Sequence, residues 1–304
     1  MFEVFYNVLF PVVLIFIAGY VTGRLFPINR KSFSIISIYL LTPALVFSSI
    51  YGYEDFFSPT TLNIFIIITI TIVLTVLVVE ILDLIFHFER SFKTILLLVL
   101  MLTNSGNFGL PITQYAFGKQ GLLIGTLAMS FYIFYTHTAG VFIAASDKST
   151  VKDAFFQMLK IPVFYAFAAA MVLNYFKIPM PAAALNSVRD MGYSGITLNL
   201  LFVGITLSDI RITRNIASVL IISIVKLTVI PFIAFPFVLF LGLKGLELKV
   251  TLTQIAMPSA IYCTILASHF NSDVKLASEI VLVSLLLSIV SLSGAIYILN
   301  LFIK

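Results

Sequence analysis

The feature that most constrains this chain is a series of long apolar segments separated by short charged turns. Of the 304 residues, 61% are hydrophobic and only 10% are charged. A helix of about 20 apolar residues can cross a bilayer, and ten segments of this kind can be placed. They lie near 5–23, 33–50, 60–86, 92–118, 121–144, 161–176, 187–207, 215–241, 249–269 and 274–303. The alternating pattern of barrel strands is missing from the sequence, so we expect an all-α integral membrane protein with ten transmembrane helices.

The remaining composition excludes several other classes of protein. Cys263 is the single cysteine and cannot form an intramolecular disulfide, and no group of Cys and His has the spacing of a metal site. We therefore expect neither a metal nor a cofactor. The net charge of +5 would suggest nucleic acid for a soluble domain, but in a membrane chain it mostly reports orientation. The first segment has no basic residue before it, so we interpret it as a retained helix and not as a signal peptide.

Lysine and arginine are distributed unevenly between the two sets of turns. The odd-numbered turns hold eleven: Arg24, Arg30, Lys31, Arg90, Lys93, Lys148, Lys152, Lys160, Arg211, Arg214 and Lys275. The even-numbered side holds six: Lys119, Lys177, Arg189, Lys244, Lys249 and Lys304. Because cytoplasmic loops carry an excess of basic residues, the odd-numbered turns are predicted to be cytoplasmic. Both termini would then be extracytoplasmic, in a multi-pass protein of the plasma membrane.

The fourth segment contains a polar interruption where an apolar helix most needs an unbroken backbone. Residues 104–111 read Asn-Ser-Gly-Asn-Phe-Gly-Leu-Pro. Pro111 lacks an N–H and crowds the preceding turn, and the glycines add flexibility, so the helix should break. An unpaired backbone group in hydrocarbon costs several kcal/mol, so broken helices lie within protein or line a wet cavity. The alternative is a proline kink that serves only helix packing.

The break predicts a binding site for an anion. The N–H groups from Gly109 to Ile112 would form a helix N-terminus, which attracts negative charge. Asn104 and Asn107 would orient the ligand, and Pro111 would hold the break open.

The second half of the chain resembles the first. Asp147 to Lys160 divides the sequence near its midpoint, into residues 1–150 and 151–304. Pro162 corresponds to Pro11, Pro258 in the ninth segment to Pro111 in the fourth, and Lys226 in the eighth to Glu80 in the third. Five helices in each half is an odd number, so the halves would have opposite topology. Inverted repeats with interrupted helices in matching places are typical of secondary transporters.

Two segments resemble a known family. Residues 103–111, Thr-Asn-Ser-Gly-Asn-Phe-Gly-Leu-Pro, are similar to the fourth-helix signature of the auxin efflux carrier family, which comprises plant carriers and bacterial relatives. Residues 256–260, Ala-Met-Pro-Ser-Ala, resemble the ninth-helix segment of that family. Cys263 is a departure, because plant members have a second proline there. The resemblance covers the whole chain in helix number and spacing.

The resemblance implies a fold, a mechanism and a substrate class. It implies two inverted five-helix repeats whose fourth and ninth helices break and cross. A transport domain made of helices 3–5 and 8–10 would move like an elevator against a scaffold made of helices 1, 2, 6 and 7, and a homodimer could form through this scaffold. Members are implied to move organic anions, auxins in plants and malate or malonate in bacterial relatives. Asn104 matches the position whose amide contacts the substrate carboxylate, and the expected site also includes Asn107, Gly109, Pro111, Pro258, Ser259 and Tyr262.

Four ionisable residues lie furthest inside the apolar segments and are candidates for ion coupling: Glu80, Asp83, Lys226 and Glu279. The long Lys226 side chain could reach toward the carboxylates, but one buried lysine cannot neutralise three of them. Burial and like charge raise a carboxyl pKa, so Glu80 or Glu279 is predicted to carry a proton. The alternative is that the acids reach water and Lys226 is paired for structure.

Two other functions are weighed against the anion carrier. A sodium/proton antiporter or sodium-coupled symporter could share a crossed-helix fold, but no pair of adjacent aspartates lies at the crossing. An intramembrane enzyme would need a nucleophile facing a base. His87, His137 and His269 lie on separate segments without a matching Ser or Asp motif, so we expect no enzyme.

Cysteine labelling tests the predicted orientation. With Cys263 replaced by alanine, Glu54→Cys and Lys244→Cys should react in intact cells with a membrane-impermeant maleimide, and Lys152→Cys should not. Outside labelling of Lys152→Cys would reverse the orientation.

Overall fold

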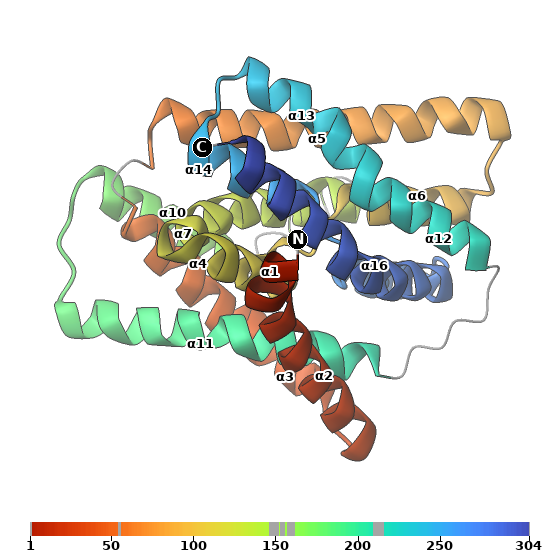
Figure 1. Ribbon diagram of the computed structural model, residues 1–304. Coiled ribbons are helices and arrows are strands. Elements are labelled where there is room, and N and C mark those ends of the chain that lie inside the picture. The colour runs from red at the N-terminus through yellow and green to blue at the C-terminus, as the bar shows by residue number, and fades with distance from the viewer. Residues whose placement is uncertain are drawn as a thin grey trace.

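A computed structural model describes residues 2–53, 56–145, 152, 156, 162–208 and 216–303. All regular structure in these ranges is helical, as predicted (Figure 1). The boundary between the two predicted halves lies outside the described residues. So do six positions used for orientation: Glu54, Lys148, Lys160, Arg211, Arg214 and Lys304.

Helices cover the ten predicted segments to within a few residues. The first half contains α1 (Phe2–Val4), η1 (Phe5–Leu9), α2 (Phe10–Leu25), α3 (Arg30–Ile36), η2 (Ser37–Leu41), α4 (Thr42–Tyr51), α5 (Pro59–Phe86), α6 (Arg90–Met101), η3 (Ser105–Gly109), α7 (Leu110–Tyr135), η4 (Thr136–Gly140) and α8 (Val141–Ala145), where η marks a π-helical turn. The second half contains α10 (Pro162–Tyr175), α11 (Ala182–Leu207), α12 (Ile216–Ile224), η5 (Val225–Val229), α13 (Ile230–Phe240), α14 (Gly245–Ile255), α15 (Tyr262–His269) and α16 (Val274–Phe302).

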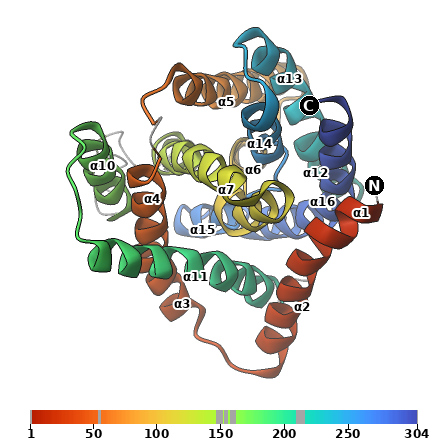
Figure 2. The same ribbon diagram turned by 60° about the vertical axis from the view of Figure 1, so that its left-hand side comes forward.

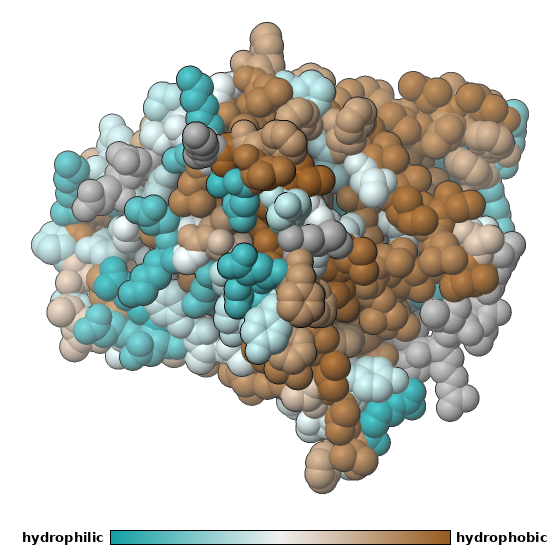
Figure 3. All heavy atoms as spheres, in the orientation of Figure 1, coloured by the Kyte–Doolittle hydropathy of each residue, from teal (hydrophilic) through white to brown (hydrophobic). Residues whose placement is uncertain are grey.

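Within the described residues, five helical stretches are long and apolar enough to cross a membrane. They are Phe2–Leu25, Pro59–Phe86, Ser105–Ala145, Ile216–Phe240 and Val274–Phe302. Ser37–Tyr51 and Pro162–Tyr175 are shorter apolar helices. Large apolar side chains such as Phe232 and Val290 are exposed on α13 and α16, where Figure 3 shows a continuous hydrophobic surface. The chain is therefore a multi-pass helical membrane protein.

Prolines account for most of the π-helical turns. The segments η1, η2, η3 and η5 each end two residues before a proline, namely Pro11, Pro43, Pro111 and Pro231. A proline cannot donate to the carbonyl four residues earlier, and its ring crowds that carbonyl. A wider turn relieves this conflict while the surrounding helix continues. At Pro43, for example, the distortion takes the form of the π turn η2 that precedes it.

The interrupted segments lie in the centre of the molecule. Figure 2 shows α6, α7, α14 and α15 enclosed by α2, α4, α5, α11, α13 and α16. Helix α7 begins next to this centre and turns back at Gly118, whose φ of 66° and ψ of −158° interrupt the helix. The predicted turn between the fourth and fifth segments thus lies at Gly118, because glycine adopts positive φ without a steric penalty.

Helices α2 and α11 pack with their backbones in direct contact. A Cβ atom on Gly204 would collide with the carbonyl oxygen of Phe16 and lie 2.6 Å from the backbone N of Tyr20. A Cβ atom on Gly19 would collide with the carbonyl oxygen of Leu201. Small residues of this kind allow close approach of helices where lipid provides no hydrophobic driving force between them.

Gly204→Ala should destabilise the protein because backbone atoms cannot move aside as a flexible side chain can. Overpacking typically costs about 1–3 kcal/mol, and the change should appear as a lower Tm of the purified protein in detergent. Gly294→Ala is the matched control, since no atom lies within 4 Å of the added Cβ on this other helical glycine. Equal Tm values for the two variants would contradict the close packing of α2 on α11.

Candidate functional site

The two interrupted helices meet through their backbones. Helix α6 ends at Met101, and the chain resumes as helix at Ser105. In the gap, Thr103 pairs with Ser259 in an antiparallel bridge. The Asn104 N–H donates to the carbonyl of Pro258 at 2.7 Å, and the Ala260 N–H donates to the carbonyl of Leu102 at 3.1 Å. Each break thereby satisfies backbone groups that the other has freed.

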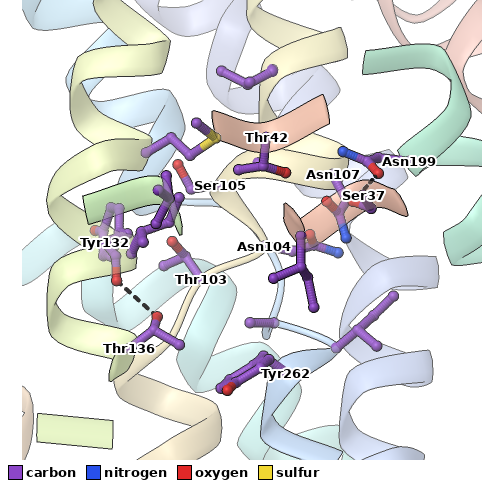
Figure 4. Close-up of a pocket in the computed structure, with 18 of the residues that line it drawn as sticks. Ser37, Thr42, Thr103, Asn104, Ser105, Asn107, Tyr132, Thr136, Asn199 and Tyr262 are labelled. Atoms are coloured by element: carbon purple, nitrogen blue, oxygen red, sulfur yellow. Dashed lines mark hydrogen bonds between the residues drawn. The ribbon is translucent and has the colours of Figure 1, made fainter. Parts of the chain in front are cut away.

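A cavity of about 170 Å³ opens beside this crossing. It is bounded by both breaks and by parts of η2, α4, α7, η4, α10 and α11. Figure 4 shows its polar side chains converging from these elements. The polar lining residues are Ser37, Thr42, Thr103, Asn104, Ser105, Asn107, Tyr132, Thr136, His137, Asn199 and Tyr262. Among the described residues, the lining contains no Asp, Glu, Lys or Arg.

Two helix N-termini contribute to the cavity. Ser105, Gly106 and Asn107 begin the half-helix after the first break, and Ile261 and Tyr262 lie at the start of α15 after the second. The first N–H groups of a helix have no partner within it and carry a partial positive charge. Since none of the described lining residues is a carboxylate that would oppose this potential, the cavity is electrostatically suited to an anion.

Asn104 offers a hydrogen-bond donor to the cavity. Its side chain is only 4% exposed, and its Nδ2 has no hydrogen-bond partner. Leaving a buried donor unpaired costs about 1–3 kcal/mol, so a ligand oxygen bound here would recover that cost. Asn107, which is half-buried, lies in the same lining.

Not every predicted site residue lines the cavity. Gly109 is packed so closely that a Cβ atom there would lie 2.7 Å from Oε1 of Gln254. Ser259 is fully buried, and its hydroxyl donates to the carbonyl of Val99 at 2.8 Å. Pro258 contributes its carbonyl to the crossing. Pro111 borders a separate cavity of about 360 Å³. These four residues shape the crossing, while Asn104, Asn107 and Tyr262 face the cavity.

Sequence reasoning missed the part of the site contributed by the surrounding helices. The Ser37 hydroxyl donates to Oδ1 of Asn199, which joins η2 to α11 at the cavity wall. Asn199 is 6% exposed, and an amide inside the apolar segment 187–207 was a signal that could have identified it.

The polar side chains of the fifth predicted segment divide between two environments. His137 Nδ1 lies 3.4 Å from the Tyr262 hydroxyl, and both residues line the cavity. Tyr132 also lines it, whereas the Tyr135 hydroxyl bonds to Thr69 at 2.6 Å. Of these three residues, Tyr132 and His137 therefore belong to the cavity wall and Tyr135 does not.

The structure separates Lys226 from Glu80 and Asp83. Lys93 Nζ lies 2.6 Å from Glu80 and 2.8 Å from Asp83, so both acids pair with a residue thirteen or fewer positions away. Lys226 instead donates to the carbonyl of Leu100 at 2.8 Å. The expectation that Lys226 reaches back toward Glu80 and Asp83 is wrong. Lys93, which is partly open to solvent, lies between the two acids and pairs with both of them. Lys226 and Glu279 are the two charged side chains that are fully buried in the described part of the chain.

Comparisons with known proteins all relate this chain to membrane transporters. Residues 4–296 match a family model described as "Membrane transport protein". An uncharacterized transporter of Methanocaldococcus jannaschii is 26% identical over 294 residues, which cover 91% of this chain and 93% of that protein. An uncharacterized transporter of Methanothermobacter thermautotrophicus is 28% identical over 200 residues, 62% of each chain, so that match spans less than two thirds of the relative's length.

Proposed function

Because the chain belongs to the membrane transport protein family of the auxin efflux carriers, we propose that it is a secondary transporter that carries a small organic anion. Family membership over nearly the whole chain makes it a transporter and not an enzyme. The substrate class goes beyond the family and is argued from the cavity.

The observation that supports an anion most directly is the unpaired amide of Asn104 beside two helix N-termini. A carboxylate oxygen would accept from Nδ2 of Asn104, and the N–H groups that follow Asn104 would stabilise its negative charge. The rest of the lining combines hydroxyls and amides with apolar side chains such as Leu110 and Ile261. A small carboxylate with an apolar or hydroxylated body matches this combination.

The proposed mechanism is an elevator-like movement of two inverted five-helix repeats, residues 1–150 and 151–304. Two features support it. The breaks pair antiparallel, as breaks in oppositely oriented repeats would. The cavity also lies between the crossing and the proposed scaffold, since Ser37, Thr42 and Asn199 come from the second and seventh predicted helices. In this proposal α2, α4, α10 and α11 belong to a scaffold that also forms a homodimer, in a plasma membrane protein with both termini outside.

Asn104→Ala should weaken binding by about 1–3 kcal/mol, because the desolvated ligand oxygen would lose its donor. A thermal-shift screen of the purified protein with malate, malonate and an auxin would identify a ligand, which at 100 times its Kd stabilises by about 2.7 kcal/mol. Ser130→Ala is the control, since this buried hydroxyl donates to Thr126 and does not line the cavity. Equal ligand shifts in Asn104→Ala and in the wild type would reject the assignment.

Glu279 is the proposed carrier of a coupled proton. It is the fully buried carboxylate of the described residues, whereas Glu80 and Asp83 are partly exposed and paired with Lys93. An ionisable residue inside a membrane-spanning helix is by default a candidate for a role in ion or proton movement. Of the two candidates from the sequence, Glu80 and Glu279, we therefore retain Glu279 as the proton carrier.

Transport in proteoliposomes with and without an imposed pH gradient tests this proposal. Glu279→Gln should lose the response to the gradient, and Glu80→Gln should keep it. A wild-type rate that ignores a gradient of either sign, or a full pH response in Glu279→Gln, would show that Glu279 is structural.

A further inference from the structure

Lys226 places its ammonium group at the carboxyl end of the broken helix α6. The residue lies in η5, is fully buried, and donates from Nζ to the carbonyl of Leu100. In an unbroken helix this carbonyl would accept from the N–H of Asn104, but that N–H donates to Pro258 instead. The carbonyl of Leu100 is left free only because α6 is broken, and Lys226 therefore satisfies it.

The neighbouring carbonyls at the end of α6 are also taken by donors from the second half of the chain. Val99 accepts from the Ser259 hydroxyl at 2.8 Å, and Leu102 accepts from the Ala260 N–H at 3.1 Å. Leu98 accepts from the Cys263 thiol at 3.4 Å. The carboxyl end of the half-helix is thus closed by side chains and backbone of the protein itself.

This end of a helix is where secondary transporters bind a coupling cation. The carboxyl end carries about half a negative charge, and carbonyls freed by a break coordinate Na⁺ in other carriers. A hydroxyl group would be enough to satisfy the carbonyl of Leu100. A buried ammonium is costly unless negative charge compensates it, so the lysine is explained by the charge that it brings to the helix end.

We propose that the Lys226 ammonium is a tethered cation that replaces a coupling sodium ion at the carboxyl end of α6. The proposal rests on the transporter function proposed above and specifies its ion dependence. Because η5 packs against α6, the charge of Lys226 stays with the broken helix during transport. It is not exchanged with the solution on either side of the membrane. The carrier should therefore work without sodium, and the carboxyl end of α6 should be stable in any salt.

The test compares the Tm of purified protein in NaCl, KCl and choline chloride at equal ionic strength. Wild-type protein should have the same Tm in all three salts. Lys226→Ala should be several degrees less stable in choline chloride and should regain part of the loss in NaCl, because a small cation can enter the vacated space. Lys226→Met, which fills that space without charge, should be destabilised in every salt. Lys249→Ala is the control, since Nζ of this half-buried lysine donates to Asn300 of α16, and its Tm should be the same in all three salts.

Three results would overturn the proposal. They are a wild-type Tm that rises specifically in NaCl, a Lys226→Met variant as stable as the wild type, and a destabilised Lys226→Ala variant with one Tm in all salts. If the Lys226 variants do not fold, the wild-type comparison and sodium-free uptake into proteoliposomes decide the question. The salt response needs no substrate, so a failure of the anion proposal would appear as missing carboxylate binding with the salt response unchanged.

Discussion

The structure depends on two backbone hydrogen bonds between segments more than 150 residues apart, from Asn104 N–H to Pro258 and from Ala260 N–H to Leu102. Where lipid surrounds a protein there is no water to satisfy a broken helix, so each freed group needs a partner within the molecule. The antiparallel pairing at Thr103 and Ser259 supplies these partners and fixes the breaks against each other. The cavity, the open helix ends and the buried lysine all follow from this arrangement.

The carboxyl end and the amino ends of the helices at the crossing have different surroundings. The carboxyl end of α6 is closed by Ser259, Lys226 and Cys263. The amino ends that begin at Ser105 and Tyr262 open to the cavity. Negative partial charge is therefore covered by protein donors, while positive partial charge is left for a ligand. This asymmetry is the basis of both proposals, an anionic ligand in the cavity and a tethered cation at the end of α6.

The charged groups show how a short-range partner can change an argument made from the sequence. One lysine is too few for three carboxylates if Lys93 serves only as a loop residue that reports orientation. In the structure Lys93 lies between Glu80 and Asp83, which leaves one buried cation, Lys226, and one buried carboxylate, Glu279. The coupling hypothesis consequently concerns Glu279, and Lys226 belongs to the crossing.

The sequence by itself determined where helices begin, break and end, because hydropathy, glycine and proline act locally on the backbone. It placed the break at Asn104 and the turn between the fourth and fifth segments. It could not determine which polar side chains meet, since the apolar faces of helices are alike and their packing depends on contacts distant in sequence. Only the tertiary structure joined Ser37 to Asn199, directed Lys226 to Leu100, and separated Gly109, Pro111, Pro258 and Ser259 from the cavity that Asn104, Asn107 and Tyr262 share.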